Sequence, residues 1–308
     1  MRAAGLLALA LTAPAHAYEL DTAFTAPVHE AITMLAADCA HEAGDADPGD
    51  VSCESALTDL RARWRQERRR LRRDVGQRTS DIARQVRWPD NPERKHVIGL
   101  GLTIVRCPGR MARGKTSLTC ESHHGGLQFF HAMASSADEP PEQTREKLLG
   151  WLGFLFDVNA NAIAPSESVC DAARRTSSQP DFVDAIEASL PCDLTVGALF
   201  DHTDVRLVAR GALLHAIQDS YSMSHARRSG ERPDDFTAIS RCEPIREFYE
   251  YGSGYQQHHH GRADVFPELA PCDGPVVDVV TASAVAMLLL DDDRDDFLAY
   301  VEERILGR

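Results

Sequence analysis

The clearest chemical pattern in the sequence is a histidine and an aspartate four residues apart, His215 and Asp219, with His225 six residues further on. Val208 and Ala212 precede His215 at intervals of three to four, so a helix would carry His215 and Asp219 on its buried face. A buried carboxylate is costly unless it is paired or bound to a metal. His225 follows just beyond the expected helix end, from where a loop could return it to the same place.

Two explanations fit this pattern. A histidine and an aspartate at this spacing on one helical face can hold a metal ion, as paired histidines do in other zinc helices. Alternatively, His215 and Asp219 form a buried hydrogen bond, and His225 is an unrelated surface residue. The sequence has no nucleophile-elbow or phosphate-loop motif, which favours metal chemistry over a serine, cysteine or lysine nucleophile.

Further candidate ligands are spread along the chain. His29 opens an apolar periodic run, and Asp90 lies in a turn flanked by prolines. His131 follows two phenylalanines in an apolar segment, where a histidine needs a partner. His260 and Asp264 repeat the spacing of a histidine and a carboxylate four residues apart. Each of these residues has an ordinary structural explanation by itself. Their occurrence together, in this order along the chain, is what favours a metal site.

In this order the residues resemble the superfamily of zinc-dependent bacterial phospholipases C and single-strand-specific zinc nucleases of fungi and plants. That family has an N-terminal Trp, then His, Asp and His, then His-x3-Asp-x5-His, then His-x3-Glu. The central motif matches at His215, Asp219 and His225, and the matching positions run from residue 18 to residue 264. This chain departs from the pattern at three positions, with Tyr18 for Trp, Asp264 for Glu, and Met223 for a Pro in the central motif.

The resemblance implies two or three zinc ions, with the carboxylate of Asp219 shared between two of them. It implies three ligand sets: Asp90, His131, His215 and Asp219; His225, His260 and Asp264; and Asp219 with His29 and the amino group and carbonyl oxygen of Tyr18. Four neighbouring histidines compete for these roles, namely His123, His124, His258 and His259.

The resemblance also implies a hydrolase of phosphate esters and diesters. A hydroxide bridging two zinc ions would be the nucleophile, because zinc lowers the pKa of bound water to about 7. Asp90 is the candidate general base. A phospholipid or a small phosphodiester is favoured as substrate, because a segment typical of the nucleases is absent and the net charge is strongly negative. Asp21 stands where the phospholipases have an acid facing the headgroup. The alternatives are a single-strand nuclease or nucleotidase, or a secreted protein that binds metal or carbohydrate without catalysis or whose zinc is purely structural.

The elements that must position these residues are predicted to be helices. Apolar residues at helical spacing predict the following ranges: Glu142–Phe156, Asp181–Ser189, Thr203–Tyr221, Val276–Leu290 and Asp293–Ile305. Leu60–Val75 is a further amphipathic pattern rich in arginine, either a solvated face or a docking face for anionic lipid or phosphate. Loops are predicted at Ala40–Asp50, Ser135–Pro141 and Ser229–Asp235. The predicted fold is all-α, a compact multi-helix domain over residues 18–308 with the zinc site between helices.

The N-terminal residues predict export. Residues 1–17 have the pattern of a signal peptide, with Arg2, an apolar stretch and a small-residue cleavage site, so the mature chain would start at Tyr18. We therefore expect a secreted or periplasmic protein. Its eight cysteines favour disulfides. Order along the chain suggests local pairs, with other connectivities open: Cys39–Cys53, Cys107–Cys120, Cys170–Cys192 and Cys242–Cys272.

The overall charge limits the partners. The net charge is −14, and loss of Arg2 with the signal peptide makes it more negative. Sequence-independent binding of duplex nucleic acid depends on a cationic surface and is therefore disfavoured, although a local cationic patch is not excluded. No later segment reaches the roughly 18 uninterrupted apolar residues of a membrane span, since Val276–Leu290 contains Asp278. The expected partner is a phosphoester substrate, with phospholipid at a membrane surface as one candidate, and the oligomeric state stays open.

Overall fold

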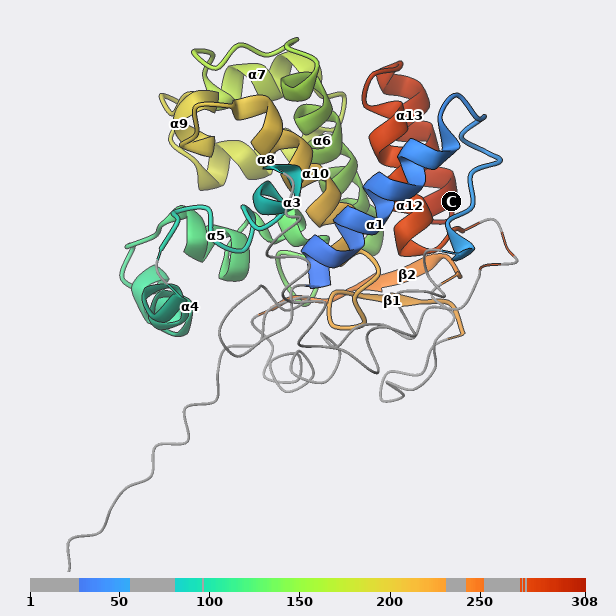
Figure 1. The fold of residues 1–308 in the computed structure, drawn as a ribbon. Coiled ribbons are helices and arrows are strands. Elements are labelled where there is room, and N and C mark those ends of the chain that lie inside the picture. Colours follow the sequence, from blue (N-terminus) through green and yellow to red (C-terminus); the bar gives the residue numbers. More distant parts are fainter. Residues whose placement is uncertain are drawn as a thin grey trace, which may run out of the picture.

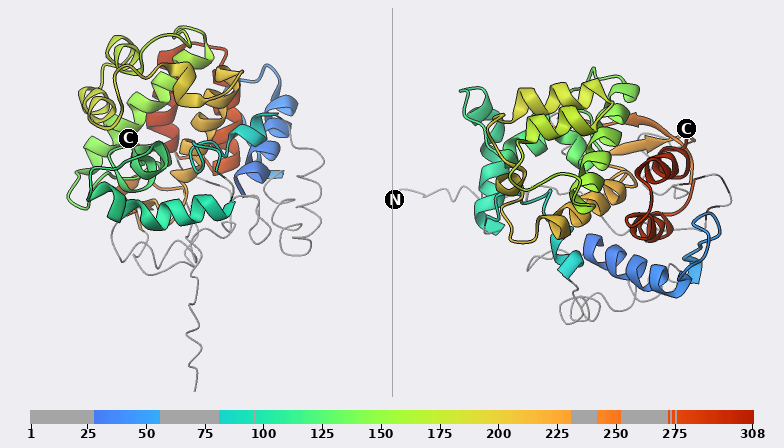
Figure 2. Two further views of the ribbon diagram at one scale, coloured as in Figure 1. Left: turned by 90° about the vertical axis from the view of Figure 1, so that its left-hand side faces the viewer. Right: turned by 90° about the horizontal axis from the view of Figure 1, so that it is seen from above.

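The computed structural model describes residues 28–55, 81–95, 97–230, 242–251, 272, 274 and 276–308. Over these ranges the protein is mostly helical, with one small two-stranded sheet (Figures 1 and 2). The predicted all-α class is confirmed. Several sequence-based predictions lie outside the described residues: the signal peptide, the helix at Leu60–Val75, and Tyr18, Asp21, His258, His259, His260 and Asp264.

Helix α10, Val205–Asp219, lies at the centre of the fold. It begins after Asp204, whose carboxylate accepts a hydrogen bond from the Leu207 backbone N–H at 3.1 Å and so satisfies a free donor of the first turn. Its residues are apolar on almost every face, which is typical of a helix surrounded by others. It packs against α6, Pro141–Asn159, against α12, Val279–Leu289, and against the short α3, Asp81–Gln85.

The remaining helices surround this centre. Helix α1, Val28–Ala43, lies along α12 (Figure 1). Three short helices cover α6 or its neighbours: α7 at Val169–Thr176, α8 at Pro180–Ser189 and α9 at Val196–Phe200. The chain ends in α13, Arg294–Tyr300, and one turn of π-helix, η2, Val301–Ile305. Helices α4, Val97–Met111, and α5, Leu118–His124, form a pair at one edge of the molecule (Figure 1).

Most of the predicted helices are confirmed. Those predicted at Glu142–Phe156, Asp181–Ser189, Thr203–Tyr221 and Val276–Leu290 are α6, α8, α10 and α12, and Asp293–Ile305 corresponds to α13 and η2. The first residues of the predicted loop at Ala40–Asp50 are wrong, because α1 continues to Ala43. The short helices α5, α7 and α9 were not predicted, because about two turns give too little periodicity to recognise. The longer α4 was not predicted either, and its sequence contains Pro108, which normally breaks a helix.

A small antiparallel sheet supports the end of α10. Strands β1, Ala226–Arg228, and β2, Ile245–Phe248, pair directly after the segment that carries His225. The buried guanidinium of Arg228 donates to the carbonyl oxygens of Ile305, at 3.0 Å, and Ser220, at 3.3 Å, and lies over the ring of Tyr221. The chain after α10 is therefore tied to the C-terminal helices, which limits where His225 can lie.

All four predicted disulfides are confirmed: Cys39–Cys53, Cys107–Cys120, Cys170–Cys192 and Cys242–Cys272. Each closes a loop between cysteines that are neighbours in the chain. Four disulfides fit an oxidising compartment outside the cytosol. Among the described residues, no helix combines the length and the apolar character that crossing a membrane requires.

Candidate metal centre

Six of the predicted ligands lie together inside the protein. They come from α1, from the turn after α3, from the 3-10 helix η1 at Gln128–His131, from α10 and from the segment before β1. Each is no more than 3% exposed. Five of them, all except His225, form with His123 three overlapping groups that could each hold a metal ion. The six are His29, Asp90, His131, His215, Asp219 and His225.

Asp219 is the centre of the cluster. Its Oδ2 lies 2.8 Å from His215 Nε2 and 3.0 Å from His131 Nδ1, and its Oδ1 lies 3.3 Å from His29 Nε2. Ligand atoms around a tetrahedral zinc ion, with bonds of about 2.0–2.1 Å, lie roughly 3.3 Å apart. The observed separations are close to this value, so small movements would suffice to admit an ion.

Three of the histidines are oriented by hydrogen bonds from Nδ1. His215 Nδ1 lies 2.8 Å from the carbonyl oxygen of Val86, and His225 Nδ1 lies 2.6 Å from that of His131. His29 Nδ1 lies 2.7 Å from Gln218 Oε1. Because the two carbonyl oxygens can only accept, Nδ1 of His215 and Nδ1 of His225 each carry the proton, and Nε2 is the nitrogen that could bind a metal. Metal-binding histidines commonly have such an oxygen partner on their second nitrogen.

The contact between His215 and Asp219 is difficult to explain as an ordinary hydrogen bond. Burial lowers the pKa of His215 to about 3, although the charge of Asp219 raises it, so the ring is neutral. With its proton on Nδ1, the Nε2 lone pair faces a carboxylate oxygen 2.8 Å away. His131 Nδ1 lies 3.0 Å from both atoms, but one proton cannot serve both at full strength. A cation among these three atoms would remove the repulsion.

The charges of the cluster are already partly balanced. Burial raises the pKa of Asp219, but its interactions with His215, His225 and His131 outweigh burial and hold that pKa well below its usual range. Burial lowers the pKa of His29, but the hydrogen bond and charge of Asp219 raise it to about 9. Asp219 is therefore ionised, as a carboxylate that binds a metal must be, and it is surrounded by histidine nitrogens.

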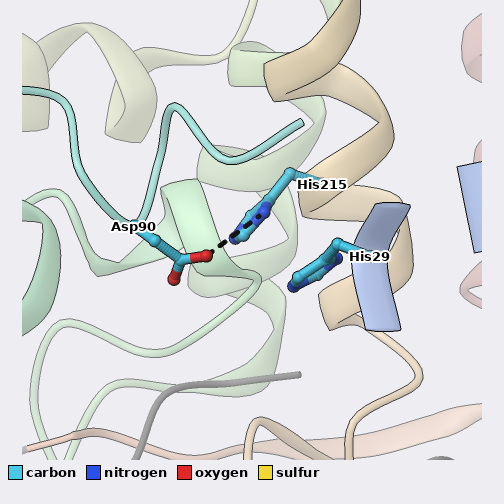
Figure 3. Close-up of side chains that lie close together, drawn as sticks. All are labelled: His29, Asp90 and His215. Carbon is cyan, nitrogen blue, oxygen red and sulfur yellow. Dashed lines mark ion pairs between the residues drawn. The ribbon is translucent and has the colours of Figure 1, made fainter. Parts of the chain in front are cut away.

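The turn that carries Asp90 is held from both sides. Trp88 is buried and its ring lies 4.9 Å from that of Phe200. On the other side, Asn91 exchanges two hydrogen bonds of 2.7 Å with the backbone of Lys95. The Asp90 carboxylate consequently points toward His215, with Oδ2 3.8 Å from His215 Nδ1 (Figure 3).

The rings of His29 and His131 both lie close to the carboxylate of Asp219 and come from two different elements, α1 and η1. The ring of His29 on α1 is stacked on that of His215, with centroids 4.1 Å apart (Figure 3). His131 ends η1, whose Phe130 stacks on Trp151 of α6 at 3.9 Å. The Nδ1 atom of His131 lies 3.9 Å from Asp90 Oδ1. Packing of η1 on α6 therefore sets the position of His131.

The prediction that His215 and Asp219 share the buried face of one helix is confirmed, because both are fully buried on α10. The alternative that His225 is a surface residue is wrong, because His225 is 1% exposed. The metal-binding roles of the six clustered residues stay predictions. Tyr18, His260 and Asp264 lie outside the described residues.

Sequence reasoning missed several residues that support the cluster. Gln218 orients His29 and also donates to Thr33 Oγ1 at 2.9 Å, which joins α10 to α1. Buried Glu30 forms an ion pair with Arg87, just before the turn of Asp90. A glutamine and a glutamate next to predicted ligands in the chain were the available signals.

Comparisons with known proteins add nothing to this geometry, since no family model, curated protein or solved structure matches the chain.

Proposed function

We propose that this protein is a secreted, zinc-dependent hydrolase of phosphate esters and diesters, similar to phospholipase C. The observation that carries the proposal is the buried group of His131, His215 and Asp219, in which two electron-rich atoms face each other at 2.8 Å. Imidazole nitrogens and carboxylate oxygens form the donor set that zinc prefers, so the residues fit this metal. A zinc ion in such a centre lowers the pKa of a bound water to about 7 and neutralises phosphoryl oxygens.

Each side chain of the cluster has its own role in this proposal. His131, His215 and Asp219 would hold one ion, and His29 would add a ligand on the α1 side of Asp219. Asp90 borders a small cavity that His131 and His225 also line. From there its carboxylate can accept the proton of an attacking water, as a general base requires. Gln218 and the Val86 carbonyl oxygen orient the histidines.

The surface beside the centre supports phospholipid as the substrate. Leu102, 47% exposed, and Val105, 66% exposed, are the large apolar side chains exposed among the described residues, and both lie on α4. The buried side of that helix, Leu100 and Ile104, packs with Tyr251, which lines the cavity beside Asp90. Two exposed apolar side chains on one face of an edge helix would suit contact with a membrane surface.

Basic residues accompany this apolar face. Arg106, Arg113 and Lys115 are exposed along or just after α4. Cationic side chains at a membrane surface are attracted to anionic lipids. The arrangement favours a lipid over a small soluble phosphodiester, in a chain whose overall charge is strongly negative.

The test is hydrolysis of bis-nitrophenyl phosphate by the purified mature protein. We expect activity that a chelator abolishes and added zinc restores. His215→Gln should lose both activity and zinc, whereas His41→Gln, at an exposed position of α1, should lose neither. Absence of hydrolysis of every phosphoester by zinc-loaded protein would overturn the enzyme proposal and favour a metal-binding protein without catalysis.

The substrate class needs a separate comparison. Vesicles of phosphatidylcholine mixed with an anionic phospholipid, and a single-stranded oligonucleotide, should be offered under the same conditions. We expect faster hydrolysis of the lipid, and Leu102→Ser with Val105→Ser should reduce that rate without changing the rate on bis-nitrophenyl phosphate. A clear preference for the oligonucleotide would favour the nuclease alternative and leave the metal chemistry unchanged.

A further inference from the structure

A second group of potential ligands lies beside the first and includes a histidine outside the three ligand sets predicted from the sequence. Asp90, His123 and His131 each place a ligand atom within 4.8 Å of the other two. All three side chains are buried, and His123 is 4% exposed. They come from the turn after α3, from the last turn of α5 and from η1.

The ring of His123 is oriented as a ligand would be. Its Nδ1 lies 2.9 Å from the carbonyl oxygen of Thr119, one helical turn earlier. Because that oxygen can only accept, a proton on Nδ1 satisfies it, and Nε2 is then the nitrogen that could bind a metal. The ring centroid lies 4.8 Å from that of His131. The same hydrogen-bond device orients His215 and His225 in the first group.

The space between these residues has the size of a single ion. A cavity of about 10 Å³ is lined by Asp90, His123, His131 and His225, together with Ser122, Met133 and Tyr251. That volume is close to the minimum that one water molecule occupies. A cation there would be surrounded by one carboxylate and three imidazole rings, which are ligand types of catalytic zinc sites.

Helix α5 is braced where it carries His123. The Cys107–Cys120 disulfide joins it to α4. The side chain of Glu93 accepts hydrogen bonds from the backbone N–H and the hydroxyl of Thr119, which ties α5 to the turn of Asp90. These links hold His123 and Asp90 in a fixed relation, and pre-positioned ligands bind an ion more tightly than mobile ones do.

We propose that His123 is a ligand of a second metal ion, bound with Asp90 in the cavity that His131 and His225 also line. This inference deepens the proposed function and rests on it, because it assigns a ligand within the same metal-dependent centre. The family resemblance places the second ion on His225, His260 and Asp264, and so contains no counterpart of His123.

The first test is zinc content after saturation and gel filtration, measured by elemental analysis. His123→Gln should lose one equivalent of zinc relative to wild type. His124→Gln is the matched control, because His124 is the next residue in α5 but belongs to none of the three ligand groups. His123→Gln with the zinc content and affinity of wild type would overturn the assignment.

A second measurement uses wild-type protein and so does not depend on the folding of a variant. In zinc-loaded crystals, anomalous diffraction on both sides of the zinc absorption edge should place an ion about 2.0–2.1 Å from His123 Nε2. Zinc found only beside His215 and Asp219 would overturn the role of His123 while leaving the proposed function intact. Wild-type protein that binds no divalent metal would overturn both.

Discussion

Gly211→Ala tests whether the packing of α10 against α3 positions the metal centre. A Cβ at residue 211 would lie 2.4 Å from the backbone carbon of Gln85 and 2.7 Å from the backbone nitrogen of Val86, whereas ordinary contacts begin at 3.4 Å. The two backbones would have to separate by about 1 Å, and neither is a flexible side chain that could move aside. Overpacking of this kind costs about 1–3 kcal/mol.

Alanine also improves the helix by about 1 kcal/mol, which offsets part of that cost. We expect a net loss of up to about 2 kcal/mol at this backbone contact, and hence a melting temperature lower by up to about 8 °C for a chain of this size. The same movement would lengthen the 2.8 Å hydrogen bond from His215 Nδ1 to Val86 beyond hydrogen-bond range. Loss of such a supporting bond lowers metal affinity about 10- to 100-fold.

Two assays measure these effects. Thermal unfolding of the chelator-treated protein gives the loss of stability, and competition with a zinc-binding dye gives the loss of affinity. Gly99→Ala in α4 is the control, because its added Cβ would lie 4.0 Å from the nearest atom, in Lys95, and should leave both quantities unchanged or raise the stability slightly. A Gly211→Ala protein with wild-type stability and zinc affinity would refute the close packing of α10 on α3.

Three further predictions concern individual carboxylates. Asp219→Asn should lose more than one zinc ion, because its Oδ1 lies beside His29 and its Oδ2 beside His215. Unchanged zinc content in elemental analysis would favour a cluster held by hydrogen bonds alone. Asp90→Asn, kept at saturating zinc, should reduce turnover of bis-nitrophenyl phosphate about 10²- to 10⁴-fold, and an unchanged rate would exclude Asp90 as general base. Glu93→Gln should be less stable than wild type near pH 6. Burial raises the pKa of Glu93, but hydrogen bonds from Lys95 and Thr119 lower it to about 2. The stabilisation is therefore present above the ordinary pKa of 4.5 and lost as the pH falls toward 2, so unfolding curves of the two proteins should converge there.

The features that could be read from the sequence are local ones. Helix α10 was predictable because its apolar residues repeat at helical spacing, and the same spacing places His215 and Asp219 on one face. The four disulfides join cysteines that follow each other in the chain, such as Cys39 and Cys53. Both kinds of prediction depend on residues that are close in sequence, where the geometry of the backbone limits the possibilities.

The tertiary structure decided which distant residues meet. Nothing local distinguishes His123 from His124, yet packing of α5 beside η1 directs only His123 into the group with Asp90 and His131. Gln218 orients His29 across a separation of 189 residues, which no pattern within either segment reveals. Such contacts depend on how whole helices pack, because a side chain's partner is set by the position of its element in the core and not by its neighbours in the chain.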